Sequence, residues 1–238
     1  MRKATPLSTG TRAKLLGGCL GLAVLAVVAF GLLIAAIFFY SSSKLAHTVP
    51  PPGDPSRFDP VAGYAQVAAF AGADVRLLSI DARFVRSDGT MDLEAEYRPS
   101  PNARYHFLRE VPAPAKAPPV GAGGNADGRW YEQVQVEVSR PWEFRSVRSI
   151  GASGSASYQY FNRGMQRRAD PPSGRAPAAT APAPVCAFSR LWRNAIARGA
   201  PATAVARIEY DARGYEFSID GLRFSMRFGV DCSVAAGG

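Results

Sequence analysis

The chain has 238 residues, of which 20% are charged, and its formal net charge is +9. A basic chain can bind nucleic acid, but beyond the N-terminal tail nearly all cations are arginines interspersed with acids. That pattern is typical of a solvated surface of mixed charge, so we expect no nucleic-acid partner.

An uncharged run covers residues 15–40 and follows a basic tail without acids at 1–14. A helix of this length exceeds the roughly 30 Å hydrocarbon core of a bilayer, so we expect one transmembrane helix. Basic flanks stay in the cytoplasm, which puts residues 41–238 outside it. The alternatives are a secretion signal cleaved after Ser43 and a lipoprotein signal acylated at Cys19. The run is too long for the first, and only four residues separate the tail from Cys19.

Two small residues in this run, Gly17 and Gly21, have the spacing that lets membrane helices approach closely. Glycine is common in membrane helices, so the spacing alone does not establish contact. A homodimer formed through the span is therefore an expectation to test.

A proline-rich segment at 41–59 follows, with the composition of an extended stalk. We expect a first α+β unit at 60–165, beginning with a helix over 61–72. A β-hairpin comes next, because apolar residues alternate on both sides of an Asp88-Gly89 turn. The alternating residues are Leu78, Ile80, Ala82 and Phe84, then Met91, Leu93, Ala95 and Tyr97.

Further strands are expected around residues 105–107 and 134–138, where alternate residues are apolar or aromatic. Two segments rich in proline, alanine and glycine interrupt this pattern. We interpret the first, 111–128, as a loop and the second, 166–185, as a linker.

A second α+β unit is expected at 186–238. Apolar residues at helical spacing predict a helix up to Gly199, and three strands should follow, joined by turns at 213–214 and 220–221. The expected fold class is α+β: a transmembrane helix, then antiparallel sheets each covered by a helix, with the two units related by duplication. Whether the units share one sheet is left open.

Two cysteines outside the apolar run, Cys186 and Cys232, fall in a compartment expected to be oxidising. We expect a disulfide between them. The alternative is two buried free thiols, since distance is not visible in a sequence. A metal site is not expected, because the only histidines, His47 and His106, are far from both cysteines in the sequence.

The stretches "AFAGADVRLLSIDARF" and "AIARGAPATAVARIEY" share the order helix, glycine, strand. This order, followed by an aromatic hairpin or meander, resembles the small PepSY-like domains of bacterial envelope proteins, which often occur in tandem. The resemblance implies a cystatin-like α+β fold in the bacterial cell envelope. Together with the expected span, it gives a bacterial inner-membrane protein with a periplasmic domain as the expected location. Some PepSY-like domains are proposed to restrain peptidases, but no residue here carries that role across.

No catalytic constellation is visible in the sequence. "GASGS" at 151–155 has serine where a nucleophile elbow needs its last glycine. A Ser-His-Asp triad would need His47 in the stalk or His106, whose strand position points it away from the core. The carboxylates at 92–96 alternate along the solvent face of a strand rather than across a cleft. We expect no catalytic residue, cofactor or metal.

Arg223 and Arg227 are expected on the outer face of the last strands, where they could bind an anionic glycan or lipid headgroup, although pairing with acids also explains them. The leading hypothesis is a non-enzymatic binding or scaffold protein that contacts another envelope protein. The alternatives are an envelope hydrolase with unidentified catalytic residues and a structural subunit of a membrane complex.

Overall fold

The chain divides into two units, Met1–His47 and Thr48–Gly238. In the first unit residues 28–33 are helical. The computed structural model describes residues 28–33, 49–115, 128–140, 143–151, 154–162, 164–174 and 179–235.

The expected transmembrane helix at 15–40 is not found in the part of the chain that the structure describes. Within the ranges just given, no helix is long and apolar enough to cross a membrane. Most of that run lies outside the described residues, and so do the tail at 1–14, Cys19, and Gly17 with Gly21.

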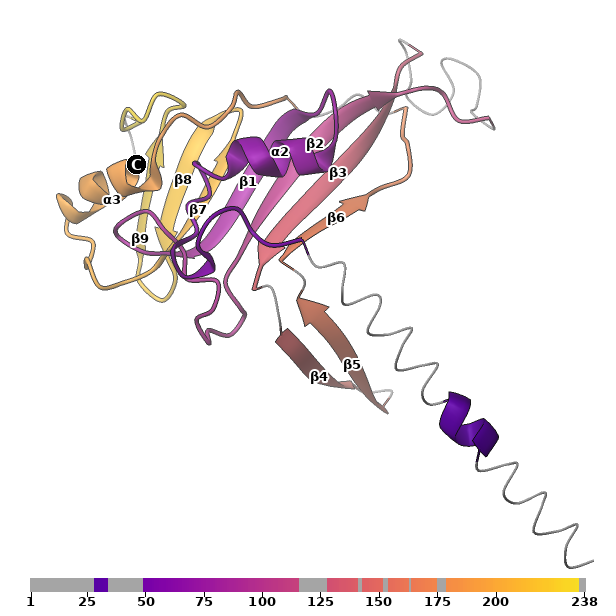
Figure 1. Cartoon of the computed structure of the whole chain (residues 1–238). Helices are drawn as coiled ribbons and strands as arrows, with labels where there is room; N and C mark the ends of the chain where they lie inside the picture. Colours follow the sequence, from indigo (N-terminus) through magenta and orange to yellow (C-terminus); the bar gives the residue numbers. More distant parts are fainter. Residues whose placement is uncertain are drawn as a thin grey trace, which may run out of the picture. The chain divides into compact units, whose positions relative to one another are not determined.

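The second unit is built on one antiparallel sheet of seven strands, in the order β6-β3-β2-β1-β7-β8-β9 (Figure 1). This corrects the expected fold class of a transmembrane helix followed by helix-covered α+β units, because the described residues of the second unit are mostly one sheet with only short helices. It also answers the open question, since both predicted units contribute strands to this sheet. Strand β1 joins them, pairing with β2 on one side and β7 on the other. The strands are β1 (Arg76–Val85), β2 (Asn102–Val111), β3 (Trp130–Ser139), β6 (Met165–Ala169), β7 (Ala206–Asp211), β8 (Gly214–Ile219) and β9 (Phe224–Phe228).

The predicted hairpin around Asp88-Gly89 is wrong in its second half. The turn exists, with Gly89 N–H donating to the Arg86 carbonyl, and Val85 forms an isolated bridge with Met91. Beyond that bridge, β1 pairs with β2 and β7. Irregularities in β1 between residues 77 and 79 and between 83 and 85 also break the expected alternation. As a result Phe84 has φ 65° and stacks on Tyr97 with ring centroids 4.6 Å apart, while Val85 is buried.

Two short helices, α2 (Tyr64–Ala71) and α3 (Phe188–Ile196), cover one face of the sheet (Figure 1). The C-terminal meander β7-β8-β9 pairs as the sequence predicts. On it, Trp192 of α3 is fully buried, edge-on against Phe217 with ring centroids 4.9 Å apart. At the C-terminus of α2, the Arg167 guanidinium donates to the Ala71 carbonyl at 2.7 Å. A cation at this position stabilises the helix, because the last carbonyl groups carry partial negative charge.

Segments expected to be a stalk and a linker instead pack on the sheet. Within 41–59, Phe58 is 1% exposed and exchanges two backbone hydrogen bonds with Met91, just after the 3-10 helix η1 (Pro55–Arg57). Within 166–185, β6 forms an edge strand and Ala181 N–H donates to the Leu77 carbonyl. The proline-rich composition predicted an extended segment, but burial of apolar side chains such as Phe58 makes the segment pack against the rest of the fold instead.

A separate two-stranded sheet is formed by β4 (Glu143–Gly151) and β5 (Gly154–Asn162). Ser155 of "GASGS" pairs with Ile150 in this ladder, so it is a strand residue and not part of a nucleophile elbow. Residues 116–127 of the expected loop lie outside the described part of the chain.

Candidate functional site

The face of the sheet opposite α2 and α3 is polar, because strand residues alternate between the two faces. On β2, Tyr105 and Phe107 are fully buried under the helices, whereas His106 between them points the other way. The registers align polar residues across this outer face. One row contains Gln166, Glu137, Arg104, Asp81, Glu209, Glu216 and Arg227, one from each strand.

Two adjoining depressions hollow the outer face, with volumes of about 380 Å³ and about 550 Å³. We call them together the outer pocket. They share Ser79, His106, Asp211 and Arg213. The lining also includes Leu78, Gln133, Ala179, Asp81, Arg207, Glu209, Glu216, Arg227, Gly229 and Ala235.

The floor of the outer pocket is a network of ion pairs on β1 and β7. Arg207 Nε and an Arg207 terminal nitrogen donate to the two Asp81 carboxylate oxygens at 2.9 and 3.1 Å. A terminal nitrogen of Arg207 also lies 2.7 Å from Glu209, and Arg83 lies 3.4 Å from Asp81. The hydrogen bond to Asp81 raises the pKa of Arg207, so this guanidinium stays charged.

Two further arginines at the pocket are also paired with acids. Arg213 in the β7–β8 turn lies 2.6 Å from Asp211, and this hydrogen bond lowers the pKa of Asp211. Arg227 on β9 lies 3.7 Å from Glu216. Every arginine that lines the pocket thus has a carboxylate partner, which a bound anion would have to displace.

His106 brings a neutral imidazole to the pocket. Burial is the main cause that lowers its pKa below the ordinary value of 6.5, and the charge of Arg104 adds to this, while Asp81 and Asp170 oppose it. Ser79 lies directly opposite His106 in the β1–β2 register. The imidazole can therefore donate one hydrogen bond and accept another at neutral pH.

The structure separates the two arginines predicted as an anion-binding face. Arg227 lies on the outer face of β9 at the pocket, whereas Arg223 is exposed in the turn between β8 and β9. The carboxylates at 92–96 lie in a turn, not on a strand, and Asp92 pairs with Arg86 at 2.8 Å. In the part of the chain that the structure describes, no group of acids, cysteines and histidines could hold a metal ion.

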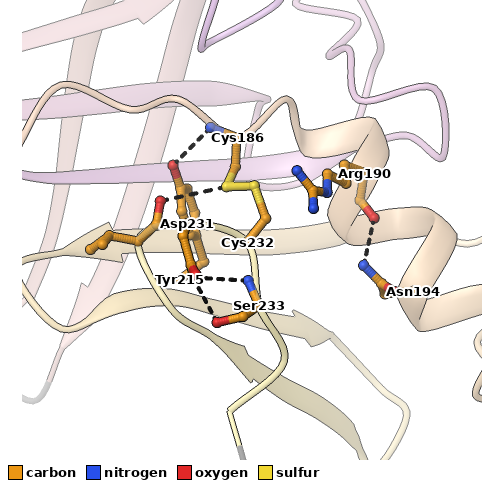
Figure 2. The surroundings of a disulfide bond; sticks show 8 residues. Cys186, Arg190, Asn194, Tyr215, Asp231, Cys232 and Ser233 are labelled. Atoms are coloured by element: carbon orange, nitrogen blue, oxygen red, sulfur yellow. Dashed lines mark hydrogen bonds between the residues drawn. A yellow bond between two sulfur atoms is a disulfide. The ribbon is translucent and has the colours of Figure 1, made fainter.

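The expected disulfide between Cys186 and Cys232 is present, with Cα atoms 5.8 Å apart (Figure 2). Cys186 precedes α3, and its backbone N–H donates to the Tyr215 hydroxyl at 3.3 Å. Cys232 lies in the segment 229–235, which folds back on β9 through a bridge between Phe228 and Val234. Gly229 and Ala235 of this segment line the outer pocket, so the disulfide tethers one pocket wall to the start of α3.

Sequence reasoning missed most of the pocket. It gave Ser79 and Asp81 no role, and it explained charges on the outer face, such as Arg227, by pairing with acids. The alternation at Tyr105 and Phe107 was the available signal, because it predicts that His106 faces outward. The cross-strand neighbours of His106 needed the register, which the sequence does not give.

Comparisons of the chain with protein-family models, curated proteins and solved structures find no match. The resemblance to PepSY-like domains therefore stays a prediction.

Proposed function

We propose that the second unit is a non-enzymatic binding module, which works in an extracytoplasmic compartment and contacts another envelope protein through the outer pocket. The observation that carries the proposal is the pocket itself, a concave surface with both polar and apolar lining on the sheet face opposite α2 and α3. Binding sites are typically concave, with a few fixed polar groups that set specificity.

The compartment is inferred from the disulfide. Such bonds persist where the surroundings are oxidising and are rare in the cytosol. The bond between Cys186 and Cys232 also supports a binding role, because it holds the segment 229–235 at the pocket.

The ionisation of Asp211 argues against this carboxyl group as a general acid. An acid catalyst needs a carboxyl group whose pKa is raised towards neutrality. At Asp211 the hydrogen bond from Arg213 lowers the pKa instead, which keeps this carboxylate charged.

In-cell photo-crosslinking tests the proposal. A photoreactive residue at Arg213, whose side chain is 87% exposed at the pocket rim, should capture one reproducible protein partner. The same residue at Glu94, which is exposed in the 92–95 turn and does not line the pocket, is the matched control. Equal capture at both positions, or none at Arg213 in a folded and exported protein, would contradict the proposal.

A hydrolase is the second candidate, because Ser79 and His106 lie opposite each other in the pocket. In that mechanism the Ser79 hydroxyl oxygen would attack an electrophile while His106 accepts its proton. A fluorophosphonate probe separates the candidates. Labelling that disappears in Ser79→Ala would support the hydrolase, and no labelling of the folded wild-type chain would exclude a serine nucleophile.

A further inference from the structure

The outer pocket is lined by four carboxylates and three arginines, so its carboxylates outnumber its cations. Glu209 on β7 and Glu216 on β8 lie directly opposite each other, and their side chains are 47% and 50% exposed. Like charges in such positions repel. Arg207 is shared between Glu209 and Asp81, and Arg227 approaches Glu216 only to 3.7 Å. A carboxylate accepts about four hydrogen bonds, so both glutamates can accept from a further cation.

The other end of the pocket offers uncharged groups. Ser79, His106 and Gln133 contribute a hydroxyl, a neutral imidazole and an amide, beside the apolar side chains of Leu78 and Ala179. These groups can donate to carbonyl oxygens and accept from N–H groups. Main-chain amides of a peptide present both.

We propose that the outer pocket binds a basic segment of the partner protein. A lysine or arginine side chain of that segment enters between Glu209 and Glu216, and the adjoining main-chain amides lie against Ser79, His106 and Gln133. This inference rests on the proposed function and states the chemistry of its ligand.

The net charge of the chain disfavours non-specific binding of a basic peptide. The formal net charge is +9, so long-range repulsion opposes the approach of a basic peptide. Binding of such a peptide must then come from local groups.

The test measures fluorescence anisotropy of a labelled, blocked alanine–lysine peptide with the full chain. The double variant Glu209→Gln/Glu216→Gln should bind about tenfold more weakly, since it removes two partly exposed ion pairs. Glu110→Gln is the matched control, because Glu110 is 53% exposed, pairs loosely with Arg129 at 3.9 Å and does not line the pocket. Its affinity should be unchanged, and the same peptide with acetylated lysines should bind the wild-type chain about tenfold more weakly.

Three results would overturn the inference: no binding of the lysine peptide, equal binding of the acetylated peptide, or equal loss in the double variant and Glu110→Gln. Thermal unfolding of both variants checks that they are folded. Failure here with reproducible capture at Arg213 would refute the basic ligand and leave the binding module standing. Loss of that capture would refute the module itself.

Discussion

Asp81 on β1 accepts two hydrogen bonds from the Arg207 guanidinium on β7, at 2.9 and 3.1 Å. Because β1 and β7 come from chain segments more than a hundred residues apart, this pair fastens the two halves of the sheet together at the pocket floor. The Asp81 side chain is only 18% exposed, so water cannot readily replace the arginine.

Replacement of Asp81 by asparagine should therefore destabilise the fold. We expect the free energy of unfolding to fall by about 2 kcal/mol, the range for hydrogen bonds to charged groups. Urea denaturation followed by circular dichroism measures this. Glu110→Gln, which loosens the exposed pair with Arg129, should change it by less than about 0.5 kcal/mol. Similar losses in both variants would mean that Asp81–Arg207 is no stronger than a surface pair.

The disulfide gives a second prediction. Cys186 and Cys232 are 46 residues apart in the sequence, and the chain-entropy relation for a loop of this size gives about 4 kcal/mol of stabilisation. Replacing both cysteines by serine should lower the midpoint of thermal unfolding. A reducing agent should lower the midpoint of thermal unfolding of the wild-type chain by a similar amount, and it should leave the midpoint of the variant unchanged. If the reductant lowered the midpoint of the variant equally, its effect would not arise from this bond.

The sequence predicted those parts of the fold that rest on uninterrupted alternation. Tyr105 and Phe107, the valines of β3 and the C-terminal meander lie on the core side as expected, and the cysteine pairing followed from compartment and number. Prediction failed where β1 is irregular, since one extra residue turns Leu78 and Phe84 to another side. It also failed at Phe58, where burial in the core decided the path of a proline-rich segment. The pocket could not be predicted from the sequence, because the neighbours of His106 lie on strands that are distant in the sequence.

Gly89 gives a third prediction, on packing of the Asp88-Gly89 turn against α3. Its φ is 86°, and a Cβ atom there would lie 2.5 Å from the backbone nitrogen of Ser189. Gly89→Ala should therefore lower the free energy of unfolding by about 2 kcal/mol or more. Gly199→Ala is the matched control, because Gly199 has φ 95° and nothing within 4 Å of the added atom. Gly199→Ala should lower the free energy of unfolding by only about 1 kcal/mol, the cost of a positive φ in a residue that has a Cβ atom. Equal losses would show that the contact with Ser189 does not limit the turn.

The pH dependence of folding gives a fourth prediction, which concerns His106. Burial lowers the pKa of His106 in the folded chain below the ordinary 6.5, so the unfolded chain takes up this proton first as the pH falls. The contribution of His106 to stability is thus complete above about pH 6.5 and declines between that value and the lower pKa of the folded state.

Urea denaturation between about pH 7.5 and 5 should therefore show a falling free energy of unfolding that is flatter in His106→Gln. The carboxylates with a lowered pKa, including Asp211 and Asp88, contribute only near and below their ordinary 3.8, outside this window. His47→Gln is the control, because it removes the other histidine and leaves the pocket intact. A slope that persists in His106→Gln and disappears in His47→Gln would show that the imidazole in the pocket is not the group responsible.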